Sequence, residues 1–337
     1  MITAFFFGFA PWKDYLPRWF PDRQCFVISR KGEVILREGW LFRILLARRA
    51  EVYVWGYKYP AFLKVFCKVF HITFKHVEDG FIRSVSLGAY GSAPASLTVD
   101  SRTLYFDATK RSDLEIILST YDFASDKLLI QRARRGMDLL MRTRISKYNL
   151  GAKSDISALF GPKDRKRILV VGQVETDASI RLGCDRALTN NDLVRFAARE
   201  NPNAQIIYKP HPEVFHGTRS GISNPADVAD ICTILREDIS PADAFATVDH
   251  VYTITSLMGF EALLRGKKVT CFGLPFYAGW GLTDDRQRNP RRRRKLNIVE
   301  IFAASYLLYP KYFDPATGAP SSFEDIVEWL HAKSVNS

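Results

Sequence analysis

The chain has 337 residues, of which 47% are hydrophobic and 25% are charged, and its formal net charge at pH 7 is +12. These values are typical of a globular protein of about two domains that buries its core without disulfide bridges. The positive charge favours anionic partners, such as nucleic acid, anionic lipid or phosphorylated substrates.

The cysteines and the apolar segments argue against a secreted or membrane-spanning protein. The cysteines are odd in number, far apart and without CxxC spacing, which predicts reduced thiols in a cytoplasmic protein: Cys25, Cys67, Cys184, Cys232 and Cys271. Residues 1–10, "MITAFFFGFA", have no basic segment before them and predict a first buried strand, not a signal peptide. No run of 18 apolar residues is present, so we expect no membrane span.

The first half of the chain reads as short apolar strands separated by helices. The expected strands are 3–9, 25–29, 51–56, 71–77, 96–100 and 103–107. Helices are expected over 37–49 and 59–70, and residues 111–150 read as largely helical. The segment 148–155, "YNLGAKSD", is predicted to be a linker.

The second half starts the alternation again, and alternation of this kind indicates parallel sheets. The expected strands are 165–173, 204–212, 251–255 and 268–273, and the expected helices are 192–200, 256–266 and 321–332, the last capped by Ser321 or Ser322. The pattern predicts the α/β class with two Rossmann-like domains facing each other across a cleft. We expect domains at 1–150 and 160–310, followed by a helical tail over 311–337.

Polar residues follow several of these strands, where open α/β sheets bind ligands. In "VGQVETDASIRLG", Gln173, Glu175 and Asp177 come just after a strand. Asp177 precedes Arg181 by four residues, so the guanidinium would meet the carboxylate if a helix has begun, and Gln173 and Arg181 are candidate substrate-binding residues. The alternative is a helix start with capping acids.

The segment "YKPHPEV" places Lys209 and His211 between prolines after another strand. Donors and positive charge suit a phosphate, although a lone histidine is often structural. At the start of "TSLMGFEALLRG", Thr255 or Ser256 would cap a helix whose first amides form an anion site. Gly259 would then allow close approach.

Three further features surround this predicted nucleotide site. Glu261 in the next helical turn is a candidate acceptor for ribose hydroxyl groups, and Gly266 would end the helix. Tyr277 or Trp280 in "GLPFYAGWG" would wall in a base, although hydrophobic packing is an equally direct explanation for both rings.

A fourth motif, "HVEDGFIRS", lies at the end of a first-half strand. Either Glu78 or Asp79 is a candidate general base for an acceptor hydroxyl, and the alternative is a plain turn.

Basic residues gather in two places. One is Arg291–Lys295, which we predict to bind anionic lipid, with donor binding as the competing interpretation. The other is a predicted helix with Arg132, Arg134, Arg135, Arg142 and Arg144. Either cluster is alternatively a solvated face. No zinc-finger, KH or RNP pattern accompanies the charge, so nucleic acid is not a favoured partner.

Together these motifs resemble a known family. The pattern S-x-x-G-x-E-A-L resembles the donor site of GT-B glycosyltransferases, and "KPHP", "TS" and "EDG" resemble motifs of bacterial transferases that use CMP-activated acidic sugars. With "GQVETDASIRLG" and "YPKYFDPATG", the set resembles one module of the KpsC-type capsule β-Kdo transferases, from about residue 5 to residue 330. Those proteins usually carry two modules in tandem, and "GQVETDAS" looks more like the second.

The resemblance implies a retaining transfer of Kdo from CMP-Kdo to a capsule or lipid-linked saccharide. It implies that Asp177 is the nucleophile, that His211 and Ser256 bind the CMP phosphate, and that Glu78 serves the acceptor. Residues 1–150 would then be the acceptor side and 160–310 the donor side. No DxD motif is present, so no metal or other cofactor is expected.

The implied location is cytoplasmic, peripheral on the inner membrane, beside other capsule assembly proteins. The alternatives are a CDP-glycerol-type glycerophosphotransferase, an inverting CMP-sugar transferase and a non-catalytic polysaccharide export component.

Overall fold

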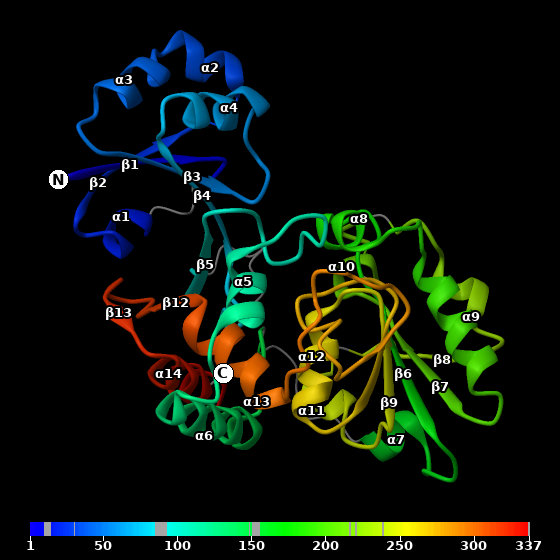
Figure 1. Cartoon of the computed structure of the whole chain (residues 1–337). Coiled ribbons are helices and arrows are strands. Elements are labelled where there is room, and N and C mark those ends of the chain that lie inside the picture. Colours follow the sequence, from blue (N-terminus) through cyan, green and yellow to red (C-terminus); the bar gives the residue numbers. More distant parts are fainter. Residues whose placement is uncertain are drawn as a thin grey trace.

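The computed structural model describes residues 1–9, 15–29, 31–84, 93–147, 149, 156–215, 217–219, 221–237 and 239–335. The chain forms two α/β domains, each built on its own sheet (Figure 1). The predicted linker 148–155 lies outside the described residues except for Asn149.

The first sheet is mixed and has the order β13-β12-β5-β4-β3-β1-β2. Its strands are β1 (Ile2–Phe7), β2 (Arg23–Ile28), β3 (Ala50–Trp55), β4 (Thr73–Asp79), β5 (Ser96–Asp100), β12 (Pro310–Phe313) and β13 (Pro320–Ser321). Strands β2, β1, β3 and β4 are parallel, whereas β5, β12 and β13 each run antiparallel to the preceding neighbour. The strands rich in Val, Phe and Tyr are buried on both faces, as parallel strands are.

Short helices cover this sheet: α1 (Leu16–Trp19), α2 (Gly32–Arg37), α3 (Trp40–Leu46) and α4 (Ala61–Val69). The prediction of a single helix over 37–49 is wrong. Gly39 has φ of 68°, a left-handed conformation that glycine adopts readily, and it separates α2 from α3. Ile35 of α2 and Ile44 of α3 nevertheless belong to the same buried cluster.

The predicted strand at 103–107 is also absent. The Asp107 carboxylate accepts hydrogen bonds from the Thr103 hydroxyl (2.9 Å), the Tyr57 hydroxyl (2.6 Å) and the Thr109 backbone N–H (3.0 Å). These local side-chain bonds stabilise turns in place of a sheet ladder.

The second sheet is entirely parallel and has the order β8-β7-β6-β9-β10-β11. Its strands are β6 (Arg167–Val171), β7 (Gln205–Lys209), β8 (Thr233–Ile234), β9 (His250–Thr253), β10 (Lys268–Cys271) and β11 (Asp284–Asp285). The helical elements of this domain are α7 (Ile156–Phe160), α8 (Ala178–Gly183), α9 (Asn190–Glu200), α10 (Pro212–Phe215), η2 (Pro225–Val228), α11 (Pro241–Ala244) and α12 (Leu257–Leu264). Counted along the chain, the strand order is 3-2-1-4-5-6, that of a doubly wound dinucleotide-binding sheet.

A helical layer connects the domains, and the end of the chain returns to the first one. It consists of α5 (Asp113–Thr120), α6 (Lys127–Thr143), α13 (Ile298–Phe302), the π-helical η3 (Ala303–Leu308) and α14 (Phe323–Val335). The tail over 311–337 is therefore not only helical, because β12 and β13 extend the first sheet. Ser322 caps α14 through the Asp325 N–H, at 3.1 Å.

An aromatic core spans the domain boundary. The Phe81 ring lies 4.7 Å from Phe276 and 5.5 Å from Tyr306, centroid to centroid. These rings belong to one buried cluster that draws residues from both halves of the chain. Burial of this apolar area holds the two domains in one arrangement.

Among the described residues, no helix combines the length and the apolar character needed to cross a bilayer.

Candidate active site

The carboxyl edge of the second sheet brings three of the predicted motifs together. Strand β6 lies between β9 and β7, with Val171 opposite both Thr253 and Lys209. The helices that follow β6 and β9 pack on opposite faces of the sheet, α9 in one core cluster and α12 in another. In doubly wound sheets this switch point between the two strands is the ligand-binding crevice. The segments after β6, β7 and β9 carry Asp177, His211 and Ser256 respectively.

Gln173 bridges the crevice instead of facing a ligand. Its Nε2 donates to the Thr255 hydroxyl (3.0 Å), and its Oε1 accepts from the Thr255 backbone N–H (2.8 Å). The Gln173 backbone N–H also donates to Asn190 Oδ1, and the Gln173 carbonyl accepts from Asn190 Nδ2. Gln173 therefore positions the turn that begins α12, and its predicted contact with a substrate stays a prediction.

Asp177 is the N-cap of α8, so the capping alternative describes part of its role. Its Oδ1 accepts from the Ser179 N–H at 2.9 Å. Its side chain remains 43% exposed, and Oδ2 lies 3.9 Å from Nη1 of Arg219. The predicted partner Arg181 is exposed and forms no ion pair with Asp177 in the described structure. Arg219 is the arginine that lies beside Asp177.

Glu175, the nearest competing carboxylate, is fully occupied. It is 5% exposed and accepts hydrogen bonds from the Asn190 N–H (2.6 Å), the Ile222 N–H (2.5 Å), the Ser223 N–H (2.8 Å) and the Ser223 hydroxyl (2.5 Å). Four donors leave this carboxylate no free lone pair for a substrate. Glu175 therefore holds the loop around Ile222, and Asp177 is the uncommitted carboxylate of the pair.

His211 uses one ring nitrogen in a hydrogen bond within its own loop. Its Nδ1 accepts from the Glu213 N–H at 3.2 Å, which places the proton of the neutral ring on Nε2. Burial lowers the pKa of His211 below 6.5, which favours the neutral form. The neutral ring is then a hydrogen-bond donor through Nε2, the arrangement a phosphate oxygen requires. Lys209, two residues earlier, is buried at the end of β7.

The structure adds Arg219 and Glu213, which the sequence analysis did not select. Arg219 Nη1 lies 3.9 Å from both Asp177 Oδ2 and Glu213 Oε2, and Glu213 Oε2 lies 4.0 Å from His211 Nδ1. The backbone N–H of Arg219 donates to the Glu213 carbonyl at 2.9 Å, so its loop is tied to α10. No local pattern marks an arginine in "HGTRSG", and only the fold brings it to Asp177.

Helix α12 begins as predicted. Ser256 is its N-cap and accepts from the Met258 N–H at 3.2 Å, and the helix has eight residues. Gly266 follows it with φ of 69°. Gly259 serves a different purpose from the one we predicted. A Cβ at Gly259 would lie 2.1 Å from the Tyr277 hydroxyl, so the close approach is that of Tyr277 and not of a ligand.

Tyr277 and Trp280 are core residues. Both are 0% exposed, the Tyr277 hydroxyl donates to the Ser256 carbonyl at 2.5 Å, and Trp280 Nε1 donates to the Phe276 carbonyl at 2.8 Å. The prediction that either ring walls in a base is therefore contradicted for this structure. Both rings are instead part of the hydrophobic packing, and Tyr277 packs against the start of α12.

Glu261 is buried at 4% exposure, and its Oε1 accepts from the Lys147 N–H at 3.4 Å. Burial raises its pKa to about 7, which the charge of Arg265 only partly opposes. Its carboxyl group therefore faces the segment that joins the two domains. Its predicted contact with a ribose stays a prediction.

The two acids of the first domain have different described partners. Asp79 forms an ion pair with the buried Arg83, with 2.8 Å between Oδ2 and Nε. Glu78 is partly exposed at the end of β4, and its Oε1 accepts from the Asp79 N–H at 3.0 Å. Both acids are partly exposed, and the choice between them as general base stays a prediction.

The cluster Arg291–Lys295 is not one exposed basic face. Arg291 donates to Glu115 Oε1 at 2.8 Å, and Arg292, 7% exposed, donates to the Pro275 and Ala278 carbonyls. Arg294 donates to the Tyr121 carbonyl at 2.6 Å. These three arginines join the connecting helices to the second domain, which leaves Arg293 and Lys295 exposed. The predicted lipid-binding cluster is therefore mainly structural.

The second basic zone is also divided. Arg132 forms a bidentate pair with Glu324, with both distances 2.8 Å, and Arg144 pairs with Asp243. Arg134, Arg135 and Arg142 are exposed on α6.

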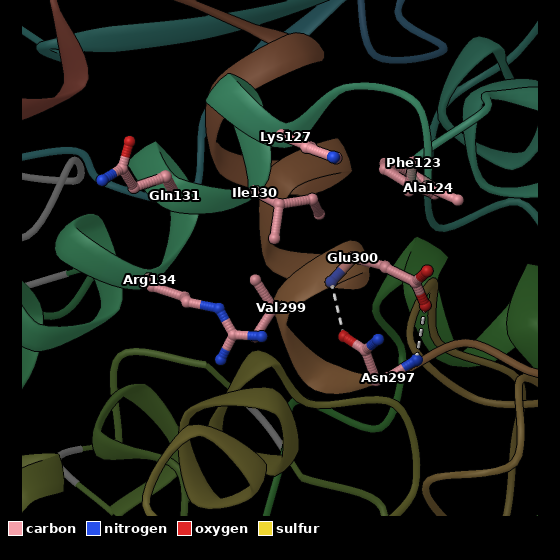
Figure 2. Close-up of a pocket in the computed structure, with 9 residues that line it drawn as sticks. All are labelled: Phe123, Ala124, Lys127, Ile130, Gln131, Arg134, Asn297, Val299 and Glu300. Carbon is pink, nitrogen blue, oxygen red and sulfur yellow. Dashed lines mark hydrogen bonds between the residues drawn. The ribbon is translucent and has the colours of Figure 1, made fainter.

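A cavity of about 380 Å³ lies between α6 and α13 (Figure 2). Lys127 and Arg134 lie along its α6 side, and Asn297 and Glu300 form a reciprocal capping box at the start of α13. It contains none of the predicted site residues, and Figure 1 places α6 and α13 well away from α8 and α10. Within the described residues, no cluster of three or more His, Cys, Asp or Glu side chains has a metal-binding arrangement.

Comparisons with known proteins agree with this arrangement. The family model described as "Capsule polysaccharide biosynthesis protein" matches residues 50–312. Lipopolysaccharide-processing protein LpsZ of Rhizobium meliloti is 47% identical over 323 residues, which is 95% of this chain and 72% of LpsZ. Capsule polysaccharide modification protein LipA of Neisseria meningitidis serogroup A is 44% identical over 277 residues. That match covers 82% of this chain but only 38% of LipA.

Two solved structures match nearly the whole chain, and both are KpsC of Thermosulfurimonas dismutans. The β-Kdo 2,4 transferase is 34% identical with a TM-score of 0.80, covering 97% of each chain. The β-Kdo 2,7 transferase is 33% identical with a TM-score of 0.72, covering 98% of this chain and 99% of the other. The fold is thus the predicted pair of Rossmann-like domains of the GT-B type. The chain belongs to the capsule polysaccharide biosynthesis protein family, within which it is a KpsC-type module.

Proposed function

We propose that this protein is a retaining glycosyltransferase that transfers Kdo from CMP-Kdo to a capsule or lipid-linked saccharide and forms a β-Kdo linkage. The observation that carries this proposal is the contrast between two carboxylates at the switch point. Glu175 has four donors, whereas Asp177 has an exposed oxygen beside Arg219 and near the His211 loop. A double displacement needs one ionised carboxylate that can approach the anomeric carbon.

The proposed first step forms a bond between Asp177 Oδ2 and the anomeric carbon. The bond from that carbon to the phosphate oxygen breaks, and CMP leaves with the electron pair. His211 Nε2–H and the α12 amides after Ser256 would stabilise the phosphate. Because CMP is a good leaving group, these donors matter more than a strong acid. This step requires no metal or other cofactor.

In the proposed second step an acceptor hydroxyl attacks the same carbon and the bond to Asp177 breaks. Glu78, at the end of β4, takes the hydroxyl proton in this scheme. Two inversions give overall retention, and Asp177 is regenerated.

Arg219 has a specific task in this scheme. The anomeric carbon of Kdo carries a carboxylate, so attack by Asp177 brings two negative charges together. Arg219 makes only long contacts of 3.9 Å to Asp177 and Glu213, and its guanidinium donates no hydrogen bond to a described residue. We assign the donor carboxylate to this guanidinium, which matches carboxylate geometry.

The test is to mix the enzyme with CMP-Kdo without acceptor, quench quickly and map the peptides by mass spectrometry. We expect one Kdo residue on Asp177 that disappears when acceptor is added. An adduct on Glu175 would reassign the nucleophile. No adduct, with inverted product, would favour an inverting transferase with Glu78 as base. CMP release from CDP-glycerol, or no CMP release from any donor, would favour the glycerophosphotransferase or the export component.

A further inference from the structure

An exposed apolar surface covers the outer side of the first domain. The large apolar side chains exposed on α2, α3, α4 and the residue after α4 are Leu36 (58%), Phe42 (65%), Leu45 (44%), Leu46 (69%), Val65 (62%), Val69 (62%) and Phe70 (50%). We call these seven residues the α2–α4 surface. Figure 1 shows the three helices together over one face of the first sheet, at the end of the molecule away from the second domain.

This surface is not the outer rim of the domain core. The inner sides of the same helices already pack on the sheet through Ile35, Ile44, Leu63 and Cys67, all nearly fully buried. In α4, Leu63 and Cys67 face inward while Val65 and Val69 face outward, each pair four residues apart. A helix that is apolar on both sides is expected to be covered on both, and large exposed patches of this kind mark interaction sites.

A cavity joins α3 to α4 at one side of this surface. Its volume is about 440 Å³, and its lining includes the apolar side chains of Leu45 and Phe70 together with Arg48, Arg49 and His71. The one acid in the lining, Glu51, is already paired with Arg23 and Lys75, at 3.0 and 3.1 Å. The cavity therefore has apolar walls and two guanidinium groups that form no ion pair with a described residue.

The charges around the surface have one predominant sign. Arg37, Arg43, Arg48, Arg49 and Lys68 are exposed on or next to these helices, and the exposed acids there are Glu33 and Glu38. Glu38 accepts a hydrogen bond from Trp40 Nε1 at 2.8 Å. Exposed apolar side chains bordered by arginine and lysine are typical of helices that lie in the interface of an anionic bilayer.

We propose that the α2–α4 surface is a membrane-binding face that inserts its apolar side chains between anionic lipids, with a headgroup phosphate at Arg48 and Arg49. A soluble partner protein fits less well, because the outward side chains form a broad surface on three helices with cations along its border. This inference goes beyond the proposed transfer reaction, since it concerns where the protein binds and needs no donor. It also replaces Arg291–Lys295, which is largely engaged inside the protein.

The experiment is flotation of the protein with vesicles of phosphatidylcholine alone or with about one third phosphatidylglycerol. We expect wild type to bind the anionic vesicles and to bind the neutral ones far more weakly. The double variant Phe42→Ser/Leu46→Ser should weaken binding about a hundredfold, because two large apolar side chains are lost from the interface. The variant Arg48→Gln/Arg49→Gln should weaken binding to anionic vesicles about tenfold or more and leave the neutral ones unchanged.

Two matched controls separate this face from the rest of the molecule. Leu128→Ser removes an apolar side chain that is 79% exposed on α6, and Arg293→Gln/Lys295→Gln removes two exposed charges of the sequence-predicted cluster. Both should bind vesicles like wild type. The substituted side chains are exposed, so all variants should unfold within a few degrees of wild type, which a thermal melt checks.

Three outcomes would overturn the inference. Wild type that does not float with anionic vesicles has no such face. If the Phe42→Ser/Leu46→Ser variant binds vesicles like wild type, or if a control variant loses binding, then another surface of the protein binds the membrane. A dimer of wild type that Phe42→Ser/Leu46→Ser converts to monomer, with no vesicle binding, makes the surface a contact between two copies. Because none of these measurements uses CMP-Kdo, failure of the proposed transfer is seen separately as inactivity of wild type.

Discussion

Gln173 and Thr255 are 82 residues apart in the sequence and are joined by two reciprocal hydrogen bonds across the crevice of the second sheet. One bond uses the Thr255 hydroxyl and the other its backbone N–H, so the amide of Gln173 fixes both the side chain and the main chain of the residue before Ser256. The start of α12 is therefore held at a set distance from the segment that carries Asp177. This link gives the site its preorganised geometry.

Gln173→Leu is expected to lower kcat/KM about ten- to a hundredfold and the free energy of unfolding by about 1–3 kcal/mol. The reason is that the Thr255 N–H loses its partner in a partly buried position. Steady-state kinetics and urea unfolding measure the two effects. Gln131→Leu, at an exposed glutamine of α6, is the control and should alter neither. Full activity of Gln173→Leu would show that the crevice does not need this link.

Substitution of Asp177 should mainly lower activity, whereas substitution of Glu175 should mainly lower the free energy of unfolding. Asp177→Asn keeps a good N-cap, so the free energy of unfolding should change by only about 0.5 kcal/mol, while transfer falls about a thousandfold or more. Glu175→Gln should lower the free energy of unfolding by about 2–3 kcal/mol, because a neutral amide replaces a carboxylate that has four donors. Denaturant unfolding with kinetics on the same samples tests this crossed pattern. A stable, inactive Glu175→Gln would reverse the two roles.

His211→Ala is expected to lower turnover by about ten- to a thousandfold, as does loss of an oxyanion donor. Burial lowers the pKa of His211, so the neutral ring, whose Nδ1 accepts from the Glu213 N–H, should persist to lower pH than it does in a free imidazole. The acid side of the kcat profile should therefore shift or disappear in His211→Ala. Activity within about twofold of wild type would remove His211 from the site.

Arg219→Gln should lower kcat/KM for CMP-Kdo about ten- to a hundredfold, since a charge-assisted hydrogen bond to the donor is lost. Inhibition by CMP should change by less than about threefold, because CMP has no sugar carboxylate. Arg195→Gln, at a similarly exposed arginine on α9, should behave like wild type. Equal loss of CMP-Kdo and CMP affinity would make Arg219 a phosphate ligand instead.

Glu261 makes stability depend on pH. Its folded pKa is about 7 and its ordinary value is 4.5, so the buried protonated form is fully compatible with folding below pH about 4.5. As pH rises through 7, the free energy of unfolding falls by up to about 3 kcal/mol compared with that of a protein with an uncharged residue at position 261. Glu261→Gln should therefore match wild type near pH 4.5 and be more stable at pH 8, as urea unfolding at both values would show. An equal difference at both values would contradict this explanation.

The sequence determined the class of fold because the relevant information is local. Alternation of apolar strands with helices predicts parallel sheets from periodicity alone. The second sheet is entirely parallel, and four strands of the mixed first sheet are parallel. The caps of α8 and α12 follow from an Asp and a Ser placed directly before apolar helical segments. Errors arose where local and non-local signals competed. Residues 103–107 look like a strand, but the Asp107 carboxylate closes them into turns.

The tertiary structure decided which of the polar residues are free to act. Glu175 and Asp177 are two positions apart and are equivalent by pattern, yet Glu175 is consumed by donors from residues 190, 222 and 223. Tyr277 and Trp280 look like ligand aromatics, but both are fully buried, Tyr277 against the start of α12. The arginines at 291, 292 and 294 look like a surface patch, but they join the connecting helices to the second domain. Arg219 becomes a neighbour of Asp177 only because β6 and β7 are adjacent strands. Hydrogen-bond saturation and burial depend on residues distant in sequence, so no local pattern contains them.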